Sequence, residues 1–336
     1  MAERDRILLA HGSGGKMAHE LITKSFIREL SNPLLAKMDD SAVVSVSGKL
    51  AFTTDSYVVS PIFFPGGDIG KLAVCGTVND LSMSGARPLY LSLAFIIEEG
   101  LPFEDLKKVV ASVKAAAAEA NVEIVTGDTK VVHHGSADKL FINTSGIGII
   151  PEGVNISGSN AKAGDVVLLS GTIGDHGVAV LSRREGLSFS TKLKSDCAPL
   201  GGLVASMLKA SRNINCMRDP TRGGLATTLN EVAQQSNVGI RIDEGAIPVR
   251  EEVLGACEML GLDPLYIANE GKLIAIVPPA DARAVLKAMK KHPYGRDAAI
   301  IGEVTDEKPG RVVMNTRIGS SRIVDMLTGD PLPRIW

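Results

Sequence analysis

Hydrophobic residues recur along this chain with two different spacings. Apolar side chains three or four positions apart predict helices, and the clearest helix covers 103–120. Further helices are expected at 18–30, 69–83, 174–184, 199–211, 223–235, 250–260 and 280–291. Short apolar or alternating runs predict strands at 42–46, 50–54, 88–98, 122–125, 140–150, 166–170, 239–243, 273–277, 299–304 and 311–314. Between the first two strands, Ser47-Gly48-Lys49 is expected to form a hairpin turn.

The order of these elements is mixed and is not a strict strand–helix–strand repeat. It therefore predicts an α+β fold of two α/β domains whose sheets are partly antiparallel. A polar stretch after Pro151 reads as a linker. We expect a mobile Gly-rich segment at 1–40, domains at 41–156 and 157–325, and an extended, mobile tail at 326–336 that holds Pro331 and Pro333.

Composition narrows the function classes. The 336 residues carry a net charge of −2, which argues against nucleic acid or an anionic membrane as the main partner. Aromatic residues make up only 4%, so stacking platforms for bases are not expected. No apolar run reaches the ~18 residues that a membrane span needs. The four cysteines form no C-x-x-C pair, and we expect them to be reduced in a cytoplasmic protein.

Acidic residues stand at the ends of predicted elements in the first half. Asp40 precedes a strand, Asp55 and Asp128 follow strands, and Asp80 lies in the apolar helix 69–83. Carboxylates at the ends of strands can meet at one edge of a sheet, and Mg²⁺ prefers oxygen ligands. Taken singly, each aspartate is more often a turn or cap residue. Asp80 stands out because a carboxylate on a buried helix needs a partner or a metal.

Several glycine-rich turns could bind an anion. Backbone N–H groups of Gly12-Ser13-Gly14-Gly15-Lys16 could surround phosphates, although the Walker A spacing is absent. The turn at 171–177 leads into a helix in a similar way, or is only structural.

Two later motifs add side-chain chemistry. Asp219 and Arg222 flank a loop just before a helix, which is suited to an anion or is simply a capped loop. Glu270 is followed by Gly271 between two strand-like pieces, 265–268 and 273–277. That glycine indicates the close approach of another group, or an ordinary turn.

In this order the motifs resemble one superfamily over essentially the whole chain. It comprises the ATP-dependent enzymes related to aminoimidazole ribonucleotide synthetase, selenophosphate synthetase and thiamine-monophosphate kinase, and within it the chain closely resembles the hydrogenase maturation factors of the HypE family. The motifs are His11-Gly12-Ser13-Gly14-Gly15-Lys16, Met38-Asp39-Asp40, Thr53-Thr54-Asp55-Ser56, Gly76-Thr77-Val78-Asn79-Asp80-Leu81, Gly127-Asp128-Thr129-Lys130, Asp219-Pro220-Thr221-Arg222-Gly223-Gly224, Asn269-Glu270-Gly271 and Asp330-Pro331-Leu332-Pro333-Arg334-Ile335.

The resemblance implies a reaction. Members of this family accept a carbamoyl group from the carbamoyltransferase HypF on a C-terminal cysteine and use ATP to dehydrate it to a thiocyanate. The cyano group then passes to iron on a HypC–HypD complex and becomes a cyanide ligand of [NiFe]-hydrogenase. The resemblance also implies a homodimer.

Roles follow from the same resemblance. ATP and Mg²⁺ would be the cofactors, and Glu270 would be the general base while Lys130 orients the thiocarboxamide. Metal ligands would be Asp40, Asp55, Asp80 and Asp128. The nucleotide would contact Gly12, Ser13, Gly14, Gly15, Lys16, Asp55, Asn79, Asp80, Asp128, Asp219 and Arg222.

The last residue departs from the family pattern. Where the family ends in cysteine, this chain has Trp336, which has no sulfur to carry the carbamoyl group. The tryptophan is an engineered or erroneous replacement, or a natural variant without the chemistry, or an internal cysteine takes over. The alternatives to a dehydratase are a small-molecule kinase or synthetase of the superfamily and a non-catalytic nucleotide-binding scaffold.

Overall fold

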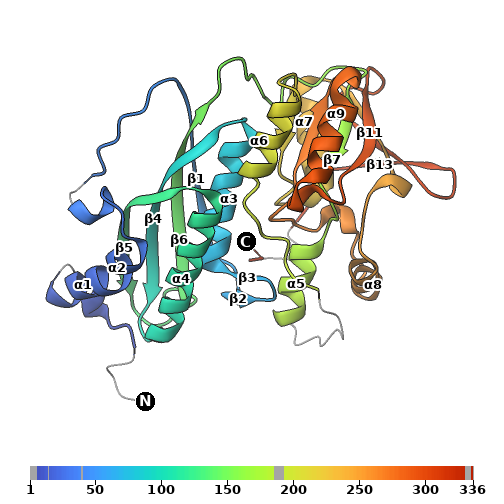
Figure 1. The fold of residues 1–336 in the computed structure, drawn as a ribbon. Helices are drawn as coiled ribbons and strands as arrows, with labels where there is room; N and C mark the ends of the chain where they lie inside the picture. Colours follow the sequence, from blue (N-terminus) through green and yellow to red (C-terminus); the bar gives the residue numbers. More distant parts are fainter. Residues whose placement is uncertain (1–5, 14, 39–40, 185–192, 330–333, 336) are drawn as a thin grey trace.

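Two sheets, each with helices beside it, make up the protein (Figure 1). The coordinates are a computed structural model that describes residues 6–13, 15–38, 41–184, 193–329 and 334–335. Asp40, Gly14 and Trp336, three of the predicted site residues, lie outside these ranges. No helix in the described ranges is long and apolar enough to cross a membrane.

The first sheet has four strands in the order β1-β6-β4-β5. Pairing is antiparallel except between β4 and β5, which run parallel. Helices α3 and α4 pack against the sheet and against each other. The elements of this half are β1 (Lys49–Tyr57), β2 (Phe63–Phe64), β3 (Gly67–Asp68), α3 (Ile69–Met83), β4 (Arg87–Glu98), α4 (Phe103–Ala120), β5 (Glu123–Val132) and β6 (Leu140–Ile150).

Before β1 comes a largely helical segment that packs beside β5 (Figure 1). Gly12 is required there, because a Cβ on it would lie 2.4 Å from the backbone nitrogen of Val131 in β5. The segment consists of η2 (Leu9–Gly12), α1 (Lys16–Leu21), η3 (Ile22–Ile27), α2 (Arg28–Leu30) and η4 (Leu35–Lys37). The helix predicted at 18–30 is thus confirmed, with a π-helical turn in its middle.

The second sheet has seven strands in the order β13-β12-β9-β11-β7-β10-β8, and only β12 and β9 pair in parallel. Both sheets are therefore mixed, as the order of elements predicts. The strands are β7 (Val166–Leu169), β8 (Cys216–Arg218), β9 (Gly239–Asp243), β10 (Ile274–Val277), β11 (Ala299–Thr305), β12 (Val312–Asn315) and β13 (Ser321–Val324). The helices are α5 (Asp175–Arg184), α6 (Gly201–Ala210), α7 (Gly224–Ser236), η5 (Glu244–Ala246), α8 (Glu251–Leu260), η6 (Pro264–Tyr266), α9 (Pro279–Lys291) and η7 (Pro293–Gly295).

Two sequence-based expectations are wrong. Residues 42–46 form no strand, and so the hairpin with 50–54 does not exist. β1 pairs with β6 instead, which leaves Val43 75% exposed. Residues 265–268 are not a strand either, because Asp263 and Pro264 begin the 3₁₀ turn η6 there.

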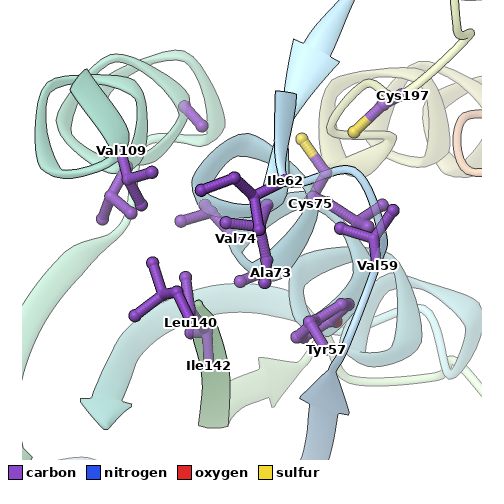
Figure 2. Close-up of a cluster of buried hydrophobic side chains, with 14 of the residues drawn as sticks. Tyr57, Val59, Ile62, Ala73, Val74, Cys75, Val109, Leu140, Ile142 and Cys197 are labelled. Carbon is purple, nitrogen blue, oxygen red and sulfur yellow. The ribbon is translucent and has the colours of Figure 1, made fainter. Parts of the chain in front are cut away.

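The two halves meet around helix α3. Its buried residues Ala73, Val74 and Cys75 face the first core, and the sulfur of Cys75 points toward that of Cys197, which precedes α6 (Figure 2). All four cysteines are buried free thiols. The first hydrophobic core thus continues from the first half into the segments that carry α5 and the chain's last described residues.

Candidate active site

An acidic cluster lies at this junction. Asp55 on β1 and Asp80 on α3 interact electrostatically with each other and with Asp219, which follows β8, and Glu270 interacts with Asp55 and Asp219. The Thr53 hydroxyl donates a 2.9 Å hydrogen bond to Asp80, so the carboxylate on the apolar helix has the partner that it requires. Four of the motifs singled out in the sequence therefore meet although they lie far apart along the chain.

Burial and mutual repulsion govern the ionisation of this cluster. Burial raises the pKa of Asp219 to about 7, with the charges of Asp80 and Asp55 acting in the same direction. Burial also raises the pKa of Asp80, against the hydrogen bond from Thr53. The charge of Arg218 acts to lower both pKa values. Sequence reasoning missed Arg218, although its position directly before Asp219 was a possible signal.

Glu270 is held through its backbone. Its side chain is only 4% exposed, and its N–H donates to the Asp196 carboxylate at 3.2 Å. A Cβ on Gly271 would lie 1.8 Å from the Asp196 carbonyl oxygen, so the close approach expected at this glycine is confirmed. Burial raises the pKa of Glu270 well above its usual value, and the charge of Asp219 acts in the same direction. A carboxylate with a raised pKa is suited to take up a proton near neutral pH.

Asn79 has a structural position in this chain. Its side-chain amide donates to the carbonyls of Ala198 and Glu270 at 3.1 and 3.3 Å, and its oxygen accepts from Leu200 N–H at 2.8 Å. A second buried amide, that of Asn269, similarly binds Gly174 N–H and the Pro220 carbonyl. These two amides fix the loops that present Asp219 and Glu270, a role that residue type alone did not reveal.

Asp128 and Lys130 lie away from this cluster. β5 and β1 are the two edges of the first sheet, three strand spacings or roughly 14 Å apart. The strand register also sets the two residues on opposite faces of the sheet. Asp128 of β5 pairs with Ala94 of β4, which in turn pairs with Asn143 of β6. Asp55 of β1 pairs with Thr144, the next residue of β6, whose side chain points to the other face. Lys130 is exposed, with its Nζ 3.6 Å from an oxygen of Asp128.

A cavity of about 300 Å³ adjoins this second group. Its apolar wall comes from the N-terminal helical segment and β4, and its polar edge from Gly12 and residues 126–130. Lys16 nearby is exposed and lies 4.0 Å from Glu20. Ser13 donates to the Ala10 carbonyl. Gly12 and Asp128 line the same cavity, whereas Asp219 belongs to the acidic cluster, and Arg222, three residues after it, is exposed.

Three of the four predicted metal ligands, Asp55, Asp80 and Asp128, lie within the described residues. Among the described residues, which leave out Asp39 and Asp40, no three His, Cys, Asp or Glu side chains are grouped closely enough to hold a metal ion. A cation would nevertheless suit the acidic cluster, because Asp55, Asp80 and Asp219 repel one another and the charge of Arg218 offsets only part of that repulsion.

The end of the chain packs inward. Ile335 is 1% exposed, and its carbonyl accepts a hydrogen bond from Nε2 of His176 at 2.5 Å. Arg334 binds the Asp138 carboxylate at 2.9 Å and the Val58 carbonyl at 3.0 Å. Ile335 lies against Gly177, which also contacts Ala268, two residues before Glu270. The tail thus reaches the neighbourhood of the acidic cluster.

The raised pKa of Asp219 predicts a pH-dependent stability. In the unfolded chain this carboxyl ionises near 3.8, but in the folded chain near 7. The free energy of unfolding therefore falls as pH rises from about 4 to 7, by up to about 4 kcal/mol. Asp219→Asn should remove this loss, so the variant gains stability over the wild type at pH 8 but not at pH 4.

Urea unfolding at both pH values measures the effect. Asp306→Asn, which alters an exposed carboxyl in the turn after β11, is the matched control and should give equal changes at both pH values. An Asp219→Asn variant with the same stability difference at pH 4 and pH 8 would contradict the assigned ionisation.

Comparison with known proteins identifies the family. Residues 38–150 match the N-terminal domain, and residues 162–315 the C-terminal domain, of AIR synthase related proteins. The chain is 56% identical to carbamoyl dehydratase HypE of Azotobacter vinelandii over 97% of this chain and 96% of that protein. The chain belongs to the HypE family.

Solved HypE structures agree with this assignment. A crystal structure of HypE in complex with ATP superposes with a TM-score of 0.95 at 52% identity, covering 98% of this chain and 99% of that one. A chain from a crystal structure of the HypE–HypF complex superposes with a TM-score of 0.81 at 55% identity, covering 91% and 99%. The resemblance drawn from the motifs is thus confirmed, and the ordered motif set identified the family correctly.

Proposed function

We propose that the chain carries the active site of an ATP-dependent carbamoyl dehydratase of hydrogenase maturation, with Trp336 in place of the cysteine that would hold the carboxamide. In this reaction ATP phosphorylates the oxygen of an S-carboxamide, and loss of phosphate and the nitrogen protons leaves an S-thiocyanate, ADP and phosphate. The observation that carries the proposal is the convergence of Asp55, Asp80, Asp219 and Glu270 beside the docked tail. Full-length identity to HypE proteins supports it.

The residues of the acidic cluster would have different roles in this reaction. Asp55, Asp80 and Asp219 are not grouped closely enough to hold Mg²⁺ by themselves, so they would hold it jointly with oxygens of the triphosphate. Magnesium, when bound, neutralises the phosphate charge and lets the attacking oxygen approach. Glu270 would take the proton from the carboxamide nitrogen, because burial raises its pKa and so makes the carboxylate a stronger base than an exposed one. Arg218 offsets the charge of the acids before nucleotide arrives.

The cavity beside β5 would take the nucleotide base. Its walls include Ile22, Phe26 and Phe95, and its edge carries the polar groups of residues 126–130. Ligand pockets combine a largely apolar lining with a few polar groups in this way. Gly12, which lines the cavity, and Ser13 beside it would face the phosphates, the role inferred from the glycine-rich motif.

A homodimer would unite the two groups of residues. The sheet face opposite α3 and α4 exposes Phe52 by 71%, Leu50 by 46% and Ile96 by 43%, a patch that a second sheet can cover. A twofold axis parallel to the strands sets β1 of one protomer over β5 of the other. Asp128 and Lys130, which lie on this open face, would then complete the partner's site.

Mixed dimers test the shared site. Asp80→Ala and Asp128→Ala should each abolish ATP binding alone. Co-expressed in equal amounts, they should bind about one quarter of the wild-type amount of ATP per chain, since half of the dimers are mixed and one of their two sites is intact. Calorimetric titration measures the stoichiometry. Complete absence of binding in the mixture would place the whole site within one chain.

The partners follow from the reaction. HypF would deliver the carbamoyl group, and a HypC–HypD complex would accept the cyanide, in the cytoplasm, where the four buried thiols remain reduced. The dehydration itself is tested by ATP turnover with HypF and carbamoyl phosphate in a Trp336→Cys variant. Trp336 favours one alternative, a nucleotide-binding scaffold without catalysis. Nucleotide binding without turnover in both versions of the tail would support the scaffold.

A further inference from the structure

His176 is a buried histidine for which the reaction described above has no use. It is 0% exposed at the start of α5 and makes two polar contacts. Nε2 lies 2.5 Å from the Ile335 carbonyl oxygen, and Nδ1 lies 2.8 Å from Oγ of Ser195. The imidazole ring packs edge-on against Phe64, with ring centroids 5.4 Å apart. The histidine therefore links the end of the chain to the segment that precedes α6.

These contacts define which nitrogen carries the proton. A carbonyl oxygen can only accept, so Nε2 of His176 must donate to Ile335. In a neutral imidazole Nδ1 is then an acceptor, which requires the Ser195 hydroxyl to donate to it. Ser195 is free to do so because its oxygen already accepts from Cys197 N–H at 3.0 Å. Burial lowers the pKa of His176 and so favours this neutral form, although the charge of Asp196 opposes it.

The same segment also holds the general base. Ser195 binds His176, and the next residue, Asp196, accepts from Glu270 N–H and from Lys272 Nζ, the latter at 3.0 Å. Lys272 and Asp196 are 12% and 3% exposed, so this pair is well shielded. One short stretch of backbone thus carries the contacts that fix both the tail and Glu270.

We propose that His176 is a positioning residue for the C-terminal tail. With its proton on Nε2 it holds the carbonyl of Ile335, the last described residue, against the segment that leads to Glu270. The inference rests on the proposed function for its catalytic meaning, but the docking itself is a physical property that can be measured without catalysis.

Trp336 offers the probe, since it is the only tryptophan in the chain. In the full-length protein, His176→Leu should lower the fluorescence anisotropy of Trp336, because a released tail lets the indole rotate freely. Amide hydrogen exchange in the C-terminal peptide should become faster by about ten-fold or more, because one buried hydrogen bond is lost. His176→Gln, whose amide nitrogen can reach the Nε2 position, should keep most of the docking.

Two further variants separate positioning from folding. Ser195→Ala removes the hydroxyl that fixes the tautomer and should give an intermediate loss of docking. His292→Leu alters a half-buried histidine elsewhere in the second half and should leave the tail unchanged. If His176→Leu misfolds by circular dichroism, the comparison of Ser195→Ala with His176→Gln decides the question.

Two outcomes would overturn the proposal. One is a folded His176→Leu protein with wild-type anisotropy and exchange, and the other is a His176→Gln protein as undocked as His176→Leu. In a Trp336→Cys background, His176→Leu should lower kcat with HypF while the Kd for ATP stays constant. If the Trp336→Cys variant with His176 intact does not bind ATP, the proposed function is wrong, but the docking role of His176 is unaffected.

Discussion

Replacing Trp336 with cysteine is expected to create HypF-dependent ATP turnover where the unaltered chain has none. The thiol supplies the nucleophile that accepts the carbamoyl group, and indole has no equivalent atom. Because the acidic cluster and the tail-docking contacts are already present, one side chain should be sufficient. We expect phosphate release with HypF and carbamoyl phosphate to rise at least about 100-fold above background. Mass spectrometry should find the added carbamoyl or cyano group on the terminal peptide.

Trp336→Ser is the matched control for this gain. Serine has the size of cysteine but its hydroxyl is a far weaker nucleophile at neutral pH, so turnover should stay at background. Equal HypF-dependent turnover in the unaltered chain and in the Trp336→Cys variant would mean that another group carries the carbamoyl. Modification of Cys75, Cys197, Cys216 or Cys257 in the unaltered chain would identify such a group.

Asp80→Ala should abolish the binding of magnesium-ATP without unfolding the protein. The carboxylate lies among Asp55, Asp219 and Glu270 and accepts a hydrogen bond from Thr53, so its removal takes away one metal ligand and little packing. Loss of one such ligand corresponds to about 3 kcal/mol, or more than about 100-fold in Kd. Calorimetry with ATP and Mg²⁺ measures the affinity. The melting temperature of the free protein should not fall, because like-charge repulsion is relieved.

Asp68→Ala is a control on the same helix. Asp68 caps the N-terminus of α3 by accepting from Gly70 and Lys71 N–H, so its loss should destabilise the helix by about 1 kcal/mol. ATP affinity should nevertheless remain close to wild type. If Asp80→Ala binds ATP as well as this control does, the acidic cluster is not the nucleotide site.

Local signals predicted the helices better than the contacts between them. The bounds of α3 and α4 agree with the expected 69–83 and 103–120, because α4 has one periodic apolar face and α3 is an unbroken run of small and apolar residues with Asp68 as its N-terminal cap. The choice of strand partner is different. The side chains at 42–46 are those of a typical strand. Whether a segment forms a strand also depends on a free sheet edge for it to pair with, and the edge of β6 pairs with β1. A sequence read locally does not contain that information.

The residues of the candidate site show the same difference between local sequence signals and contacts that form only on folding. Asp55, Asp80, Asp219 and Glu270 all belong to motifs singled out in the sequence, and the fold brings them within electrostatic reach of one another. Asp128 was expected among them, yet register and strand order set it on the other edge and the other face of the sheet. His176 and Arg218 were missed, since their importance comes from contacts with groups that are distant along the chain and meet them only after folding.

The three hydrogen bonds of Asn79 limit how this molecule can open. They join α3 to the segment at 198–200 and to Glu270, deep inside the junction. A hinge motion that swung the two halves apart as rigid bodies would have to break all three at once in a dry interior. Entry and exit of ligands should therefore proceed through local rearrangement of the tail and the N-terminal segment, while the two halves keep a fixed orientation throughout the cycle.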